Sequence, residues 1–290
     1  MKKLNHTELI LTPEGCIYHL NIKPENLADT IILVGDPDRV PVVSAFFDGI
    51  EFIGQNREIV THTGYYKQKR LTVMSTGMGP DNIDIVINEL DALVNIDLER
   101  KLPKDSLKSL KIIRLGTSGA VQPDIGVDRF AIAEYALGLD GLLHFYGDVD
   151  KVIAQPLTTD FIRHFQAPED TPTPYIVSCS PELSHLFDPD WLRGITVTAP
   201  GFYGPQGRSL RLPLSNPNLI DQLSAFKAGD LRIINFEMES SAIYSLCKLM
   251  GHQCLTICVI VANRINSAYS KDYHASMKKL IGEVLDKLVQ

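Results

Sequence analysis

The sequence predicts an α/β fold in which one domain, residues 1–290, is built on a mixed or mostly parallel β-sheet flanked by helices. Short runs rich in β-branched residues recur along the chain, and many are apolar throughout, as is typical of strands covered on both faces. Helical patterns lie between these runs, and such alternation favours a parallel or mixed sheet. The chain has neither an internal repeat nor a low-complexity linker, so a single domain is expected.

The expected elements follow one another in regular order. Strands are predicted at residues 30–34, 71–75, 111–115, 129–133, 175–178, 195–198, 232–236 and 255–261. Apolar residues at helical spacing predict helices at residues 82–94, 216–226, 239–250 and 272–289. The last helix has an apolar stripe of Ile281, Val284, Leu285 and Leu288. Residues 97–110 (DLERKLPKDSLKSL) are the most charged stretch and are expected to form a surface insertion.

Composition excludes several classes of protein. With 44% apolar and 22% charged residues, the chain is neither disordered nor collagen-like. The net charge of −7, without a Lys/Arg run, argues against nucleic-acid binding but allows a small anion. The most apolar run, residues 254–262, is too short to span a membrane. The five cysteines lack metal-ligand spacing, so we expect free thiols, no metal site and a cytoplasmic location.

The first expected strand ends in residues 35–39 (GDPDR). Gly35 lets the backbone approach a ligand closely, and backbone N–H groups at a helix start, with Arg39 beside them, can bind an anion. A strand–helix turn with a surface arginine explains the same residues equally well. This loop alone therefore does not decide between the two interpretations.

Two further strand ends carry glycines and hydroxyl groups, in residues 75–80 (STGMGP) and 114–120 (RLGTSGA). Neither loop is a Walker A or GxGxxG motif. Arg114 lies on an apolar strand, and its burial requires an anion or a carboxylate. Because ligands bind where strand-end loops converge, these loops predict a ligand site; arginines simply paired with Asp or Glu are the alternative.

A fourth motif, residues 235–242 (NFEMESSA), places two carboxylates around Met238 at a predicted helix start. Carboxylates there can merely stabilise the helix dipole. Beside an arginine-lined anion site, they can instead accept hydrogen bonds from sugar hydroxyls.

Taken together, these motifs resemble the uridine phosphorylase branch of the nucleoside phosphorylase family, from about Ile17 to the C-terminus. Residues 35–39 match the family's phosphate loop, 75–79 its STGxG loop, 114–120 its RxGT(S/T)GA strand and 236–239 its FEME element. The resemblance implies a partly closed mixed sheet. It also implies paired subunits whose sites borrow residues from the neighbour, with a homodimer as the minimal unit and a homohexamer, a trimer of dimers, as the assembly.

The resemblance also implies roles for individual residues. Phosphate would be bound by Gly35, Arg39, Arg57, Arg114 and Thr117. Ribose would be bound by His19, Met238 and Glu239. Of these, Arg57 and His19 would reach the site from the partner subunit. Considered alone, His19 is more often an ordinary surface or core histidine.

Residues 201–208 (GFYGPQGR) indicate the branch, because uridine phosphorylases carry the pattern of Phe202, Gln206 and Arg208. A glutamine amide matches the N3–H and a carbonyl of uracil, and an arginine donates to a carbonyl that becomes negative. Without the family, a Gly/Pro-rich surface loop explains this segment. Residues 262–264 (ANR) stand where purine enzymes have Ser-Asp, and Arg264 is expected to support the base pocket.

The expected reaction is phosphorolysis of uridine to uracil and ribose 1-phosphate in pyrimidine salvage, with Arg114, Arg208 and Glu239 as catalytic residues. Inorganic phosphate is the co-substrate, and no organic cofactor is required. Glu58 matches a ligand of a monovalent cation in some relatives, but residues 79–82 (GPDN) depart from the common GGPS, so the cation is not expected. The alternatives are a purine nucleoside phosphorylase, a nucleosidase and a non-catalytic nucleoside-binding protein.

Overall fold

A computed structural model describes residues 3–290. Its strands are β1 (Thr30–Val34), β2 (Gly49–Asn56), β3 (Ile59–Tyr66), β4 (Lys69–Ser75), β5 (Ile96–Asp97), β6 (Leu102–Pro103), β7 (Lys111–Ala120), β8 (Phe130–Gly138), β9 (Tyr175–Ser178), β10 (Leu192–Thr198), β11 (Lys227–Ala228), β12 (Leu231–Glu237), β13 (Gln253–Asn263) and β14 (Ala268–Tyr269). Its α-helices are α1 (Arg39–Ser44), α2 (Pro80–Asn95), α3 (Gln155–His164), α4 (Pro181–Ser184), α5 (Leu219–Ala225), α6 (Ser240–Met250) and α7 (Tyr273–Leu288). Short 3-10 helices are η1 (Pro24–Asn26), η2 (Leu142–Phe145), η3 (Val149–Lys151) and η4 (Gly204–Gln206).

The main sheet has 12 strands, and its order is β11-β12-β10-β8-β13-β7-β1-β4-β3-β2, with β9 on β8 and β14 on β13. Strands β4, β1, β7 and β13 run parallel, whereas β8 is antiparallel to β13. An additional antiparallel pairing of β12 with β7, Asn235 opposite Ala120, closes a ring of β7, β13, β8, β10 and β12. The prediction of a mixed, partly closed sheet is therefore confirmed.

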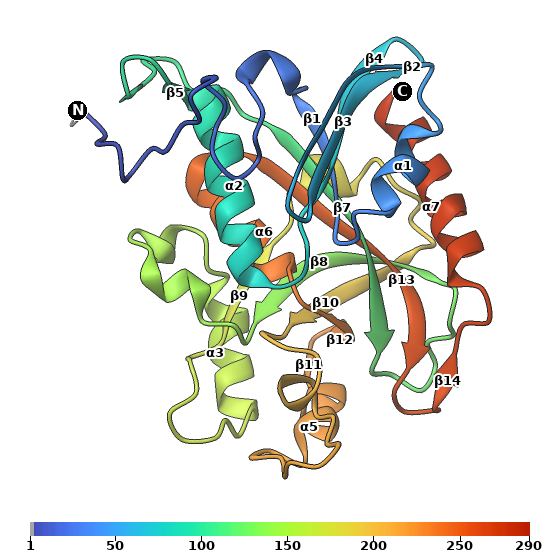
Figure 1. Ribbon diagram of the computed structural model, residues 1–290. Coiled ribbons are helices and arrows are strands. Elements are labelled where there is room, and N and C mark those ends of the chain that lie inside the picture. The colour runs from blue at the N-terminus through green and yellow to red at the C-terminus, as the bar shows by residue number, and fades with distance from the viewer. Residues whose placement is uncertain (1–2) are drawn as a thin grey trace.

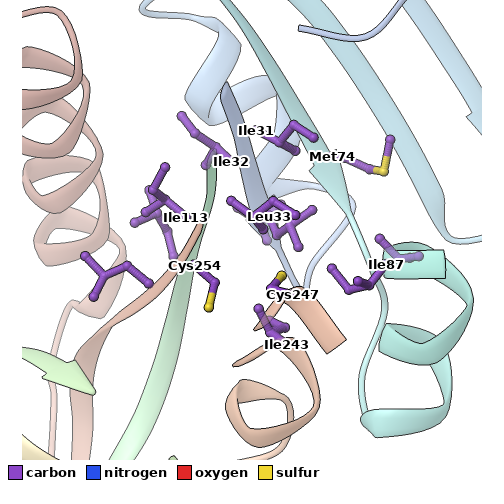
Figure 2. Packing of buried hydrophobic residues seen from close by; sticks show 14 of the residues in the cluster. Ile31, Ile32, Leu33, Met74, Ile87, Ile113, Ile243, Cys247 and Cys254 are labelled. Atoms are coloured by element: carbon purple, nitrogen blue, oxygen red, sulfur yellow. The ribbon is translucent and has the colours of Figure 1, made fainter. Parts of the chain in front are cut away.

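Helices cover both faces of the β1 region of the sheet, with α2 and α6 on one side and α1 and α7 on the other (Figure 1). All five residues of β1 are consequently buried, which explains why this strand is apolar throughout. Figure 2 shows Leu33 of β1 among Ile243 and Cys247 of α6, with Ile87 of α2 close by. Helix α7 buries the predicted stripe from Ile281 to Leu288, and the side chain of Asp272 accepts a hydrogen bond from Ala275 N at 3.1 Å.

The structure also differs from the predicted elements. The β2–β3 hairpin and α3 were not expected; β2 is largely exposed and lacks a continuous apolar run. The helix expected at residues 216–226 spans only Leu219–Ala225, after an irregular segment. Residues 97–110 are mostly exposed, as predicted for a surface insertion, and include the β5–β6 pairing.

The cysteines are free thiols, four of them buried and Cys16 partly exposed. Among residues 3–290, no helix is long and apolar enough to cross a membrane.

Candidate functional site

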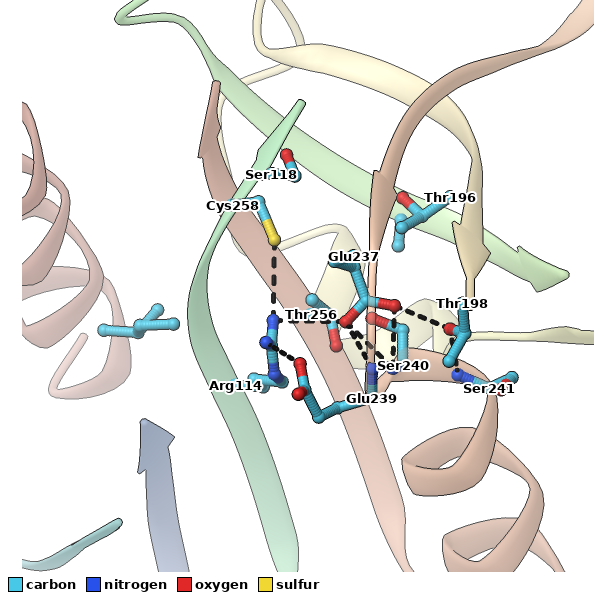
Figure 3. Close-up of polar contacts among 12 residues, drawn as sticks. Arg114, Ser118, Thr196, Thr198, Glu237, Glu239, Ser240, Ser241, Thr256 and Cys258 are labelled. Atoms are coloured by element: carbon cyan, nitrogen blue, oxygen red, sulfur yellow. Dashed lines mark hydrogen bonds and ion pairs between the residues drawn. The ribbon is translucent and has the colours of Figure 1, made fainter. Parts of the chain in front are cut away.

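Arg114, in the middle of β7, is the centre of a buried polar cluster (Figure 3). Its Nη2 donates to Oε2 of Glu239, and its Nη1 lies 3.3 Å from Oε2 of Glu237. Nη1 also lies 3.6 Å from the Sγ atom of Cys258 on β13. Arg114 is therefore paired with carboxylates through its Nη atoms, as the alternative interpretation of the sequence expected.

The Nε side of this guanidinium makes no hydrogen bond within the described residues. Nε of Arg114 is buried and has no hydrogen-bond partner within residues 3–290. Burial lowers the pKa of Arg114, but the carboxylates of Glu239 and Glu237 outweigh burial and raise it, so the side chain stays cationic. A buried, charged guanidinium with a free N–H can accommodate another acceptor, such as an anion oxygen.

Glu237 belongs to this buried cluster, although the sequence reasoning did not include it in the site. Its Oε1 accepts from Thr198 Oγ1 at 2.6 Å, and its Oε2 accepts from the backbone N of Glu239 at 2.9 Å. Both oxygens also lie 3.0 Å from Ser240 N, at the first residue of α6. Glu237 therefore orients Arg114 and the start of α6 together. The available signal was a second carboxylate two positions before Glu239, where a helix begins.

Glu239 joins the second glycine loop to this cluster. Its Oε1 accepts a hydrogen bond from Gly79 N at 2.7 Å, while Oε2 faces Arg114. Gly79 has a φ of 97° and Gly77 a φ of 71°, a region that favours glycine. Burial and neighbouring Glu237 raise the pKa of Glu239, although Arg114 acts in the opposite direction. Met238 lies half-buried between the two carboxylates.

Arg39 brings a second guanidinium to the same place. Its Nη1 donates to the carbonyl of Leu115 on β7 at 3.3 Å. Burial, and then the nearby charge of Arg114, lower the pKa of Arg39. Two partly or fully buried cations so close repel each other, and an anion between them would relieve that repulsion. Gly35 packs on the Gly77 loop, and half-buried Thr117 lies three residues beyond Arg114 on β7.

A separate cluster forms around η4. Arg208 lies over the Phe202 ring at 3.9 Å, and its Nη1 donates to Phe202 O at 2.8 Å and to Gln206 Oε1 at 2.6 Å. Arg264 donates to Gln206 O at 2.8 Å. Burial, followed by the charge of Arg264, lowers the pKa of Arg208 to about 10. Among residues 3–290, neither of these cations forms an ion pair with a carboxylate, so a carbonyl acquiring negative charge suits them.

The two clusters share β7 as their support. The backbone N of Arg264 donates to Ala120 O at 3.0 Å, at the end of the strand that carries Arg114. Asn263 is buried, and its Nδ2 donates to the carbonyls of Gln122 at 2.8 Å and Ile125 at 2.7 Å. Asn263 thus anchors the turn that positions Arg264.

His19 and Arg57 lie outside both clusters. The Nδ1 atom of His19 is 2.6 Å from Glu89 Oε1, and its carbonyl accepts from Asn56 Nδ2 at 2.9 Å. Arg57 is exposed at the β2–β3 turn with a φ of 53°. The Cγ atom of the adjacent Glu58 lies 3.0 Å from the point where a Cβ atom at Gly77 would stand, so this turn borders the loop of residues 75–80. Within the described residues of one subunit, no hydrogen bond or ion pair joins His19 or Arg57 to Arg114.

A mixed α/β sheet with a closed ring, a buried arginine–carboxylate cluster and a cation-rich loop at η4 is the arrangement expected of a nucleoside phosphorylase-like protein. The family model of the phosphorylase superfamily matches residues 29–289, so the chain belongs to this superfamily.

Individual relatives agree with this family. The chain is 31% identical over 274 residues to a uridine phosphorylase of Thermococcus kodakarensis, covering 93% of this chain and 86% of the relative. It is 27% identical over 251 residues to a DeoD-type purine nucleoside phosphorylase of Listeria welshimeri, covering 83% and 85%. A solved structure of a Trypanosoma brucei nucleoside phosphorylase, described as showing uridine phosphorylase activity, superposes with a TM-score of 0.83. It shares 31% identity and covers 97% of this chain and 99% of that one.

Proposed function

We propose that this protein is a pentosyltransferase that cleaves uridine with inorganic phosphate, giving uracil and ribose 1-phosphate. The observation that carries the proposal is the pairing of Arg39 and Arg114 in one cluster with Gln206 and Arg208 in the next, both supported by β7. The first cluster suits phosphate, and the second suits a uracil ring. Relatives named uridine phosphorylase support the same substrate.

The chemistry follows from the two clusters. Phosphate, oriented by Arg39 and Arg114, attacks C1′ of the ribose while the bond from C1′ to the base nitrogen breaks. The electron pair of that bond leaves with uracil, which then takes up a proton. Gln206 and Arg208 stabilise the negative charge that develops on the base carbonyls. Fixed orientation of phosphate beneath C1′ accounts for a large share of the acceleration.

Glu239 has the geometry to change partners during this reaction. Its carboxylate accepts hydrogen bonds from Arg114 and from Gly79 N. Once phosphate engages Arg114, the carboxylate can accept hydrogen bonds from the ribose hydroxyls beside Met238. This exchange keeps buried charges paired in both states.

The proposal includes an assembly. Arg57 and His19 of a partner subunit complete the phosphate and ribose sites in a homodimer, and three dimers form a homohexamer. Pyrimidine salvage in the cytoplasm is the proposed setting. Phosphate is the co-substrate, no organic cofactor is needed, and the cation expected in some relatives is not required.

A purine nucleoside phosphorylase is the second candidate, because purine enzymes are also among the relatives. Asn263 argues against it, since its amide is committed to two backbone carbonyls and no carboxylate stands there for a purine ring.

The test incubates the protein with uridine, thymidine, inosine and adenosine, with and without inorganic phosphate. The proposal expects phosphate-dependent cleavage of uridine and ribose 1-phosphate as the sugar product. Free ribose at an equal rate without phosphate would establish a nucleosidase, and equal rates on inosine would establish purine specificity. Tight nucleoside binding without turnover would indicate a binding protein.

A further inference from the structure

A cavity of about 450 Å³ lies beside residues 201–208, the base loop, and shares Gly204 and Pro205 with η4. Its walls come from four segments that are distant in sequence: Leu139 after β8, residues 165–172 after α3, residues 200–205, and residues 213–219, which reach the start of α5. They contribute Leu139, then Phe165 and Pro172, then Pro200 and Pro205, then Leu214 and Leu219. The residues that line it include neither Arg39, Arg114, Glu239 nor Arg208 within the described chain. The cavity therefore adjoins the base loop but is not lined by the charged side chains of the two clusters.

The lining of the cavity is mostly apolar. Proline is its most frequent residue type, and proline lacks a backbone N–H, so much of the wall offers no donor. Phe165 stacks on Phe161 with ring centroids 5.1 Å apart, which makes this wall an extension of the core. The volume is in the range of cavities that hold small organic ligands, and such ligands are bound by apolar walls with a few placed polar groups.

One polar group in the lining lacks a partner. Nδ2 of Asn216 is buried and makes no hydrogen bond within residues 3–290. The amide orientation is set by its oxygen, which accepts from Asn218 N at 3.2 Å and from Gln222 Nε2 at 3.5 Å. A flipped amide would place the NH2 group against two donors. A ligand acceptor that reaches Nδ2 would satisfy this donor.

We propose that this cavity is a second binding site, for a small aromatic molecule that carries a single carbonyl acceptor. The ring would pack on Phe165, Leu214 and the prolines, and the carbonyl would accept a hydrogen bond from Asn216 Nδ2. Pro205 lies in both the cavity wall and η4, immediately before Gln206. An occupant therefore braces the base loop and changes the affinity for uridine rather than for phosphate.

The test uses two probes of the same shape, acetophenone, which has a carbonyl, and ethylbenzene, which does not. Binding to the full-length protein is measured by saturation-transfer NMR and by titration, independently of any activity. Acetophenone should bind about fivefold more tightly than ethylbenzene, the effect expected of one added hydrogen bond. The KM for uridine should shift with acetophenone present, while the KM for phosphate should not.

Two variants make the test specific. Asn216→Asp keeps the size and the acceptor of residue 216 but removes the donor, so the advantage of acetophenone should disappear. Ser215→Trp, at the exposed rim of the cavity, should block both probes. Both variants should retain the wild-type melting temperature and basal activity.

Three results would overturn the proposal. These are no saturable binding of acetophenone, unchanged preference between the probes in Asn216→Asp, and displacement of the probe by uridine from a single shared site. Failure of the uridine assignment would leave the binding measurements unaffected, because they do not depend on turnover.

Discussion

Glu237 and Glu239 both face Arg114, but their other contacts give them different freedom. Glu237 also accepts from Thr198 Oγ1 and from backbone N–H groups at the start of α6. Glu239 accepts only from Gly79 N besides Arg114, among the contacts of the described residues. Apart from Arg114, which both carboxylates face, loss of Glu237 would leave Thr198 Oγ1 and the backbone N–H groups at the start of α6 without an acceptor. Loss of Glu239 would leave only Gly79 N without one. Glu237 is therefore the fixed support of Arg114, and Glu239 is the partner that a substrate can replace.

This difference predicts the effect of Glu237→Gln. The amide keeps one acceptor for the α6 backbone but turns an NH2 group toward donors and removes the charge facing Arg114. We expect kcat on uridine to fall roughly 10- to 100-fold through misplacement of Arg114, with a smaller change in the KM for uridine. Ser240→Ala is the matched control, because its hydroxyl has no partner in the described chain and the backbone N is retained. A Glu237→Gln variant within twofold of the wild type would show that Glu237 is dispensable.

Glu239→Gln is predicted to separate stability from activity. Burial raises the pKa of Glu239. At pH values between the ordinary carboxyl pKa and this raised pKa, the folded protein keeps a proton on Glu239 that the unfolded chain has released. Stability is then lost as the pH rises through that window. The neutral glutamine avoids this loss, and its melting temperature at pH 7 should exceed that of the wild type by roughly 1–3 °C.

The same substitution should abolish most uridine cleavage, since an amide cannot replace the carboxylate at Arg114 and ribose. The measurement is thermal unfolding of both proteins from pH 3 to pH 8, and the stability gain should vanish toward the acid end. A variant less stable than the wild type at pH 7 would show that the ion pair with Arg114 outweighs the burial of Glu239.

At the scale of elements, we expect η4 and the residues after it to determine which nucleoside base the protein accepts. Arg208 is positioned by stacking on Phe202 and by Gln206 Oε1, so truncation removes its donors without removing a strand. Arg208→Ala should lower kcat/KM for uridine by roughly 100-fold or more. Phosphate should still raise the melting temperature of the variant as much as that of the wild type.

Arg211→Ala is the control for this prediction. Arg211 is an exposed arginine three positions further along the same loop, and it should retain wild-type kinetics when replaced. Equal losses in both variants would mean that overall positive charge matters rather than the placed guanidinium of Arg208.

Elements with strong local signals could be predicted from the sequence. Strands β1 and β9 span the predicted residues, because buried strands must be apolar along their length. The β2–β3 hairpin could not be found in this way, since its first strand is mainly exposed and lacks a continuous apolar run.

Site residues could be predicted where a short motif contains the charged side chains themselves. They could not be predicted where a residue's role depends on contacts with residues distant in sequence. Arg114 and the carboxylates were recognisable as a set, and the structure brings them into contact. The division of work between Glu237 and Glu239 depends on Thr198 and Gly79, which lie far from them in sequence. Nothing local in the chain indicates that Asn216 lines a cavity with an unpaired donor.

At the scale of the whole molecule, closure of the ring between β7 and β12 explains why one subunit carries two clusters. Phe236 pairs with Gly119, so the segment bearing Glu237 is fixed against the strand bearing Arg114. Arg264 is fixed to the end of the same strand. His19 and Arg57 are held elsewhere, at α2 and at the hairpin turn. In the homodimer proposed above, they would serve the site of the other subunit.

Mixing two inactive variants tests this arrangement. In a two-fold symmetric dimer, each site would combine Arg114 of one subunit with Arg57 of its partner. Arg57→Ala and Arg114→Ala should each be nearly inactive alone, because each lesion then affects both sites. A mixed dimer would contain one site with both lesions and one intact site. After equimolar co-refolding, half of the dimers are mixed, so activity should return to about a quarter of the wild-type value.

The recovered activity is informative because neither parent can supply it. Formation of mixed assemblies is verified by tagging the two variants differently and isolating the doubly tagged species, which in a hexamer of randomly mixed dimers should have about a quarter of the wild-type activity. Arg57→Ala mixed with Arg39→Ala should behave in the same way, since Arg39 contacts β7 of its own subunit. Arg39→Ala mixed with Arg114→Ala should stay inactive. Each subunit supplies both arginines to its own site, so in a mixed dimer one site lacks Arg39 and the other lacks Arg114. If doubly tagged Arg57→Ala and Arg114→Ala dimers are as inactive as their parents, Arg57 acts within its own subunit and the shared site is wrong.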